Sequence, residues 1–418
     1  MKWITRIITT LKSKLSIRQD EENMVQKNSV IDIHIKTNEV DGPSGYLNWI
    51  GQKEGDKEQG IFEINLYSDA HLTSEIESGT ECPYAILNAL PLPLGYLSGI
   101  RHSLTLRIHV FRKQSRIEKE KTESSNFHGG WLADEIAAII SLLTGVRIKP
   151  GSLTRDFNRN DPLGCPKAEN EPPAAFTQNN RFLLVVPGAK GEHNITDLML
   201  PLFYTYPSLS SEQAIRLTRA ARLYQDALWI CESQPEMAWL LLTSAIEVLA
   251  VFEQLTCTSP QEILEGSYSE LMAILEGSGD DRLIEKVSQE LHPLLRSTGR
   301  FVDFLLKYQP GEPENKPEKC ISIDWDPDNL KKLFQKIYDY RSRALHDGIP
   351  FPPPMCGPAV IGDWLQEAPG GLWVETAGGK WMKKDLPLML HTFEYIVRNS
   401  IINWWKSIIE DSEEVTDD

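Results

Sequence analysis

Two residues in the C-terminal half, Arg341 and His346, are of types that together could do chemistry. A guanidinium stays charged and offers a planar fork of N–H donors to a phosphate. An imidazole titrates near neutral pH and can take a proton from an oxygen or return one to it. Together they suffice to cleave RNA through its own 2′-hydroxyl: His346 acts as general base or acid, and Arg341 stabilises the charge that grows on the scissile phosphate. This chemistry needs no metal ion, and we expect neither a metal nor a cofactor.

A single helix must position this pair. Asp326-Pro327 predicts its start, because Asp caps helices and Pro suits the first helical position, and Asp347-Gly348 predicts its end. Arg341 lies near the centre of the apolar face, where a charge needs a partner or a task. A five-residue step turns a helix by about 500°, which leaves the two side chains about 140° apart. They converge only if the helix ends near His346, which the Asp-Gly pair favours, or if two copies of the chain contribute. The apolar face consists of Leu330, Leu333, Phe334, Ile337, Ala344 and Leu345.

Structural roles for the pair remain open on spacing alone. An Arg followed by His at this loose spacing is expected about once by chance in a chain of this length. A His at a helix C-terminus is favourable simply because of the helix dipole. A buried Arg can belong to a structural ion pair, for instance with Glu247 of the apolar stretch Trp239–Phe252.

The residues around the pair resemble a known family. The stretch Tyr338–Gly348 resembles the signature Tyr-x-x-Arg-Ser-x-x-x-His-x-Gly of HEPN domains, in particular the Apea-like group. The run Ala238–Leu249 is similar to another helix of that group, and the resemblance covers about residues 210–409. Trp131–Arg147 is more loosely similar to an element that precedes HEPN domains in bacterial proteins of this kind.

The resemblance implies a metal-independent endoribonuclease in which Arg341 and His346 are catalytic and Ser342, the polar residue after the Arg, assists. It also implies a homodimer or higher homo-oligomer, in which two protomers place their Arg and His residues in one composite cleft. Many bacterial members act in antiviral defence by abortive infection, or as toxins. The implied partners are an RNA substrate such as tRNA and a phage-derived trigger. The alternative is a non-catalytic HEPN-type module that dimerises and binds a signal.

The composition of the chain excludes several classes of protein. The chain has 418 residues and a formal net charge of −16, which excludes a broadly basic nucleic-acid coat. Its six cysteines form no C-x-x-C pair, which argues against a disulfide scaffold or a zinc ribbon and favours the cytoplasm. The apolar stretch Trp239–Phe252 is too short and too polar to suggest a membrane span.

The periodicity predicts an α+β fold in which a mixed α/β domain precedes an all-α, HEPN-like helical bundle. Residues 29–207 form the first domain, with a sensing or restraining role, and residues 208–409 form the bundle. A Pro-, Gly- and Trp-rich insertion at 349–385 interrupts the bundle, and residues 410–418 form an acidic tail. We expect strands at Val30–Ile35, Ile61–Tyr67, Leu104–Phe111 and Arg181–Val186. Helices are expected at about 131–143, 210–232, 236–254, 281–307, 326–348 and 386–409, with another starting at Ser259-Pro260.

The N-terminal segment 1–28 begins with a basic stretch. Residues 1–18 carry five basic residues and no acid, and their apolar residues recur at helical spacing. They predict an amphipathic helix that contacts a membrane surface or a partner. A helix that docks on its own protein or frays is the alternative. Six histidines lie too far apart in sequence to suggest a shared ligand set and were assigned to the surface or the core: His102, His109, His128, His193, His292 and His391.

Overall fold

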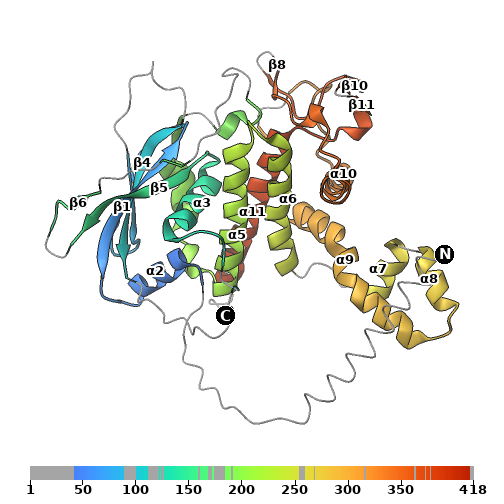
Figure 1. Cartoon of the computed structure of the whole chain (residues 1–418), viewed down its shortest axis with the longest axis horizontal. Coiled ribbons are helices and arrows are strands. Elements are labelled where there is room, and N and C mark those ends of the chain that lie inside the picture. Colours follow the sequence, from blue (N-terminus) through green and yellow to red (C-terminus); the bar gives the residue numbers. More distant parts are fainter. Residues whose placement is uncertain are drawn as a thin grey trace, which may run out of the picture. The chain divides into compact units, whose positions relative to one another are not determined.

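The computed structural model has a sheet in the first half of the chain and helices in the second (Figure 1), which confirms the predicted α+β class. The predicted N-terminal segment 1–28, the expected strand Val30–Ile35 and residues 415–418 of the acidic tail lie outside the described residues. The structure describes residues 42–414 except for 89–99, 112–121, 123, 125–126, 159–160, 168–171, 174–183, 190–191, 254–258, 268, 315–316, 362–363, 372 and 377.

Five antiparallel strands form the main sheet in the order β3-β4-β1-β5-β6. Alternate side chains, such as Ile64 and Leu66 of β1 and Leu104 and Leu106 of β4, are fully buried, as a half-covered sheet requires. The predicted strands at 61–67 and 104–111 are therefore confirmed as β1 and β4. The bounds are β1 Gly60–Ser68, β3 Tyr84–Asn88, β4 Arg101–Val110, β5 Lys149–Phe157 and β6 Cys165–Pro166.

The expected strand Arg181–Val186 is wrong in its described part, residues 184–186. The backbone N–H groups of Val185 and Val186 donate to the carboxylate of Glu232 instead of to a neighbouring strand. A side chain thus satisfies the donors that a strand ladder would have used. Short two-stranded pairs occur elsewhere: β2 (His71–Thr73) with β7 (Glu192–Asn194), β8 (Val360–Ile361) with β9 (Trp364–Leu365), and β10 (Trp373–Thr376) with β11 (Gly379–Met382).

Helix α3 (Leu132–Thr144) packs against β5 and the helix α5 (Ser211–Ile230), and almost all of its residues are buried. It ends as its sequence predicts, at Gly145, whose φ of 71° lies in the left-handed region. A Cβ atom at this position would lie 3.0 Å from Cζ of Arg398, whose guanidinium donates to the carbonyls of Leu142 and Leu143. The helix end and the Arg398 side chain therefore both depend on glycine here.

We expect Gly145→Ala to lower the free energy of unfolding by about 1–2 kcal/mol, because alanine disfavours this φ and crowds Arg398. The matched control is Gly299→Ala, at an exposed position inside helix α9 (Asp281–Lys307) where an added Cβ meets nothing within 4 Å. The same substitution should raise stability there by about 0.5–1 kcal/mol. Urea denaturation measures both, and equal signs for the two variants would contradict this account.

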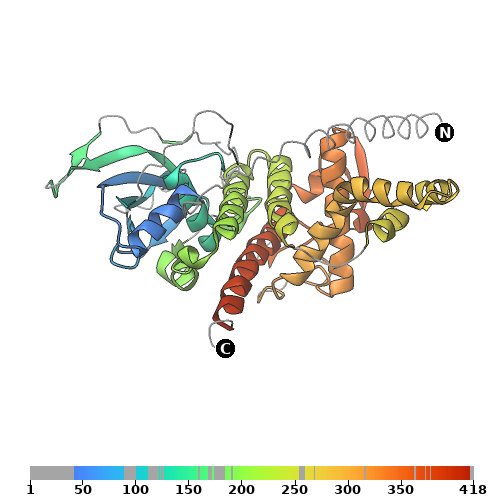
Figure 2. The same ribbon diagram turned by 90° about the horizontal axis from the view of Figure 1, so that it is seen from below.

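The other predicted helices lie close to their expected bounds, whereas α2, α4 and α8 have no counterpart among the predictions. Helices α5, α6 and α11 lie side by side (Figures 1 and 2), and α9 packs on α6 and α10. The last helix starts later than expected and continues to Glu414, so that Glu410 and Asp411 of the predicted acidic tail are helical. The bounds are α2 Ser44–Lys53, α4 Ile195–Phe203, α6 Pro235–Phe252, α7 Pro260–Ser267, α8 Ser269–Glu276, α10 Pro327–His346 and α11 Leu390–Glu414.

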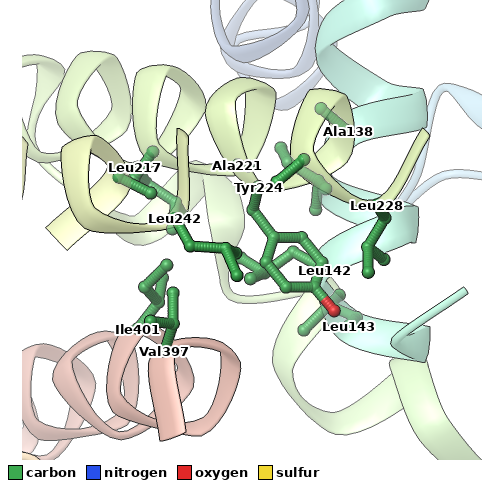
Figure 3. Packing of buried hydrophobic residues seen from close by; sticks show 14 of the residues in the cluster. Ala138, Leu142, Leu143, Leu217, Ala221, Tyr224, Leu228, Leu242, Val397 and Ile401 are labelled. Atoms are coloured by element: carbon green, nitrogen blue, oxygen red, sulfur yellow. The ribbon is translucent and has the colours of Figure 1, made fainter. Parts of the chain in front are cut away.

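One hydrophobic core joins the two predicted domains. Tyr224 of α5 packs among Leu142 of α3, Leu242 of α6 and Val397 of α11 (Figure 3), and the same cluster reaches the sheet. The described residues accordingly belong to one compact unit. The change from strands to helices near residue 207 is real, but the packing runs across it without interruption.

Helix α6 is, among the described residues, the one helix long and apolar enough by length and composition to cross a membrane. It begins at Pro235, four residues before the apolar stretch whose shortness argued against a span. Its neighbours are α5, α9, α10 and α11, and Trp239 stacks between Phe351 and Phe393 with ring centroids 5.2 and 4.7 Å away. Packing within the helical half buries Trp239 and 44% of the helix, while Met237 and Val251 remain 46% and 57% exposed.

Candidate active site

The helix that carries Arg341 and His346 is α10, and its sequence explains both of its ends. The Asp326 side chain accepts a hydrogen bond from the N–H of Asp328 at 3.0 Å, and Pro327 occupies the first turn. At the other end, the N–H of Asp347 donates to the carbonyl of Arg343, and Gly348 has a φ of 66°. Both predicted boundaries are confirmed.

Arg341 has a partner, and it is the one suggested by the sequence. Its Nη2 donates to Oε2 of Glu247 on α6 at 2.7 Å, with about a fifth of each side chain exposed. The guanidinium also lies over the ring of Tyr338, 5.4 Å from its centroid. This ion pair explains how a charge occupies the apolar face of α10.

Tyr338 completes a three-residue network. Its hydroxyl donates to Oε1 of Glu247 at 2.8 Å, so that the carboxylate is shared between Tyr338 and Arg341. Burial and this hydrogen bond raise the pKa of Tyr338 to about 12, with a smaller opposing effect of Arg341. The phenol therefore remains a donor at neutral pH and holds Glu247 in place. The Nε atom of Arg341 is buried and has no hydrogen-bond partner in the described chain.

His346 lies on a different side of the same helix. Because α10 remains helical through this residue, the two side chains project about 140° apart around its axis. His346 is exposed, and nothing in the described part of the chain joins it to Arg341 or Ser342. The expectation that the helix end lets the pair converge within one chain is therefore wrong. Ser342 is half-buried and lies one residue beyond Arg341.

The insertion at 349–385 is anchored to another face of α10. Lys336 forms an ion pair with Asp385 at 2.8 Å, and the hydroxyl of Tyr340 donates to the carbonyl of Asp385 at 2.6 Å. Tyr340 precedes Arg341 by one residue, so its side chain points about 100° away from it. The end of the insertion is therefore fixed to α10 on a side different from that of the Glu247 network.

Two apolar side chains near His346 face solvent. Leu345 is 52% exposed and Ile349 is 44% exposed, although both are large hydrophobic residues. Among the described residues, no group of three or more His, Cys, Asp or Glu residues could hold a metal ion. What this end of α10 offers is an exposed imidazole beside uncovered apolar surface.

A second polar constellation escaped the sequence-based interpretation. His109, assigned to the surface or the core, lies between the carboxylate of Glu58 and the hydroxyl of Ser78. No spacing rule could have found this set, because the three residues come from separate segments that only the sheet brings together.

The chain was compared with protein-family models, with curated proteins and with solved structures, and none of them matches it.

Proposed function

We propose that the chain is a metal-independent endoribonuclease of the HEPN type, in which His346 of one copy and Arg341 of another copy act on the same RNA phosphate. The observation that carries the proposal is the placement of these two residues on different sides of α10. One chain offers each group separately. A symmetric pair of chains can combine them, since in a two-fold dimer each contact is made twice.

The network around Arg341 supports a role in binding phosphate. The carboxylate of Glu247 accepts from Nη2, which supplies only part of the five N–H donors of the guanidinium, and about a fifth of the Arg341 side chain is exposed, so it keeps donor capacity for an additional acceptor. Glu247 and Tyr338 hold the side chain in a single orientation before substrate arrives. Such preorganisation is what electrostatic stabilisation of a transition state requires.

The surroundings of His346 support the second copy. A partner that covers Leu345 and Ile349 would bury apolar area that is now exposed and would surround the imidazole with protein. The side chain would then lie at an interface instead of at a free helix end. Ser342, on the same helix, would assist from beside Arg341, as the resemblance implies.

We place this activity in bacterial antiviral defence, with RNA such as tRNA as substrate, a phage-derived trigger as partner and the sheet-containing part as the sensing or restraining element. The cytoplasm is the compartment we propose, and the five described cysteines are free thiols.

The ion pair of Arg341 with Glu247 equally favours the second candidate, a non-catalytic module that dimerises and binds a signal.

An experiment that mixes two inactive variants tests whether two chains share a composite cleft. In a heterodimer of Arg341→Ala and His346→Ala chains, one composite cleft keeps both groups and the other loses both, so we expect about half of the wild-type cleavage rate per dimer. Each variant alone should leave RNA uncut. The measurement is cleavage of total RNA, tRNA included, by differently tagged chains purified through both tags from phage-infected cells.

The outcomes decide between the candidates. Wild-type cleavage with no recovery in the heterodimer would contradict the composite cleft. RNA left intact by the wild-type chain, in infected and uninfected cells alike, would contradict the nuclease and favour the binding module.

A further inference from the structure

Three polar side chains from distant segments meet at one end of the main sheet. Glu58 precedes β1, Ser78 lies in the loop between β2 and β3, and His109 is near the end of β4. The Nδ1 atom of His109 lies 2.8 Å from Oε2 of Glu58, and its Nε2 atom lies 3.1 Å from Oγ of Ser78. The imidazole therefore bridges a carboxylate and a hydroxyl through its two nitrogen atoms.

The neutral imidazole satisfies both contacts in one tautomer. An ionised carboxylate only accepts, so the hydrogen bond to Glu58 requires the proton on Nδ1 of the neutral imidazole. Nε2 is then the acceptor, and the Ser78 hydroxyl must donate to it. This is the protonation pattern in which a serine hydroxyl can lose its proton to a histidine as the oxygen attacks.

The histidine is held by a rigid frame. Asn48 of α2 is fully buried; its Nδ2 donates to the carbonyl of His109 at 3.0 Å, and its Oδ1 accepts from the N–H of Phe111 at 2.9 Å. The N–H of His109 donates to the carbonyl of Pro83 at 2.9 Å. The backbone on both sides of the imidazole is thus fixed from α2 and from the start of β3.

The loop that carries Ser78 is also tied down. The N–H of Gly79 donates to the carbonyl of Cys82 at 3.0 Å, and the carbonyl of Gly79 accepts from the side chain of Gln52 of α2 at 2.6 Å. A Cβ atom at Gly79 would meet nothing within 4 Å. The hydroxyl therefore belongs to a turn fixed by hydrogen bonds, and Ser78 itself is partly exposed.

We propose that Ser78, His109 and Glu58 form a nucleophilic triad that hydrolyses carboxylic esters, an activity separate from RNA cleavage. Ser78 is the nucleophile, His109 is the general base and then the general acid, and Glu58 is a positioning residue that fixes the imidazole. A pocket of about 360 Å³ lies beside Glu58 and His109, which line it together with Gly60, Arg107 and Phe157. Ser78 is not among its lining residues, so the pocket lies beside the base and not at the nucleophile.

The reaction balances with water as the only co-substrate. Oγ of Ser78 bonds to the carbonyl carbon while its proton passes to Nε2 of His109. The tetrahedral intermediate collapses as the carbon–oxygen bond to the alcohol breaks, and Nε2 returns the proton to the leaving oxygen. Water then attacks the acyl group on Ser78 and gives its proton to Nε2, which reprotonates Ser78 as the carboxylic acid leaves.

Covalent labelling of the full-length chain tests the nucleophile. A fluorophosphonate probe should attach to Ser78 with loss of fluoride, and peptide mass mapping should locate the adduct there. Ser78→Ala should abolish labelling, and His109→Ala should slow it by about 10²–10⁴-fold, the usual contribution of a general base. Ser233→Ala is the matched control, because the exposed Ser233 hydroxyl donates to the carbonyl of Ile230 and contacts no imidazole among the described residues.

Matched variants test the roles of the other two residues. His102 lies on the same strand, and its ring contacts the hydroxyl of Thr105 at 2.9 Å and no carboxylate in the described part of the chain, so His102→Ala should label like the wild type. With a p-nitrophenyl ester, Glu58→Gln should lower kcat by about tenfold or more with little change in KM, because a carboxylate that orients the base acts on the chemical step.

The following results would contradict the roles proposed for the three residues. An unlabelled Ser78 in the folded wild-type chain would do so, and so would equal labelling rates in the wild-type and His109→Ala chains. A Glu58→Gln variant that alters only KM would remove Glu58 from the proposed role. His346→Ala should label normally, so that a failure of the ribonuclease proposal leaves this one intact.

Discussion

Replacement of His346 by alanine is expected to reduce RNA cleavage by about 10²–10⁴-fold, the range typical of the loss of a general acid or base. The side chain is exposed at the end of α10 and makes no hydrogen bond within the described chain, so the fold does not depend on it. The free energy of unfolding should change by less than about 1 kcal/mol, the size of a charge interaction with a helix end.

RNA integrity in cells that express each variant, before and during phage infection, measures this effect together with cell survival. Arg343→Ala is the matched control, since Arg343 is an exposed cation on the same helix whose guanidinium lies over the ring of Tyr340. It should cleave like the wild type. A His346→Ala chain that cuts RNA at the full rate would remove His346 from the mechanism.

The His346→Ala variant tests the chemistry more directly than Arg341→Ala does, because the fold depends on the contacts of Arg341 but not on those of His346. Arg341→Ala removes the ion-pair partner of Glu247 and leaves a partly buried carboxylate with Tyr338 as its remaining donor. Lost cleavage in that variant could then come from a local change in packing between α6 and α10. Both variants are needed, but only His346→Ala separates chemistry from structure.

Replacement of Arg147 by methionine is expected to lower the free energy of unfolding by about 3–5 kcal/mol, the cost of breaking a buried ion pair and leaving its partners unpaired. Arg147 is 5% exposed. Its Nε donates to the carbonyl of Leu228 at 2.8 Å, and its Nη1 forms an ion pair with Asp69 at the same distance. Its Nη2 lies 3.4 Å from Glu232, whose carboxylate also accepts from the N–H of Val185.

These contacts join the sheet to the end of α5, so the variant also tests the division into domains. Because the main hydrophobic core extends through the sheet-containing and the helical parts, we expect this core to unfold in a single transition by urea in the wild type and in Arg147→Met. The control Arg155→Met removes a 37%-exposed arginine that lies 3.6 Å from Glu63, and should cost less than about 1 kcal/mol. Two separate transitions, or equal costs for both variants, would contradict this view.

The helices were largely predictable because their signals are local. The predicted helix at 281–307 matches α9, and the signals at Asp326-Pro327 and Gly145 mark true helix ends. Capping residues, proline at the first turn and glycine after the last turn act within a few residues of the boundary. The expected strand at Arg181–Val186 failed in its described part, residues 184–186, because the carboxylate that accepts from the N–H of Val185 belongs to Glu232, far away in the sequence.

The candidate functional residues also fall into two groups: those that local sequence signals identify and those that only distant contacts bring together. The sequence alone identified Arg341 and His346 as candidates and placed them on one amphipathic helix, because residue type, spacing and periodicity are properties of a single segment. Ser342 is a candidate only because the resemblance implies it. It also named Glu247 as an example of a partner for Arg341, but the distance of 2.7 Å comes from the packing of α6 on α10.

The divergence of Arg341 and His346 follows from the geometry of α10 itself. Only the tertiary structure decided that both halves share one core and that Glu58, Ser78 and His109 come together. These outcomes depend on contacts between segments far apart in the sequence. Such contacts form when the burial of apolar surface offsets the entropy of closing the intervening loops. No local sequence pattern reports this balance between apolar burial and loop-closure entropy, so these contacts are seen only in the tertiary structure.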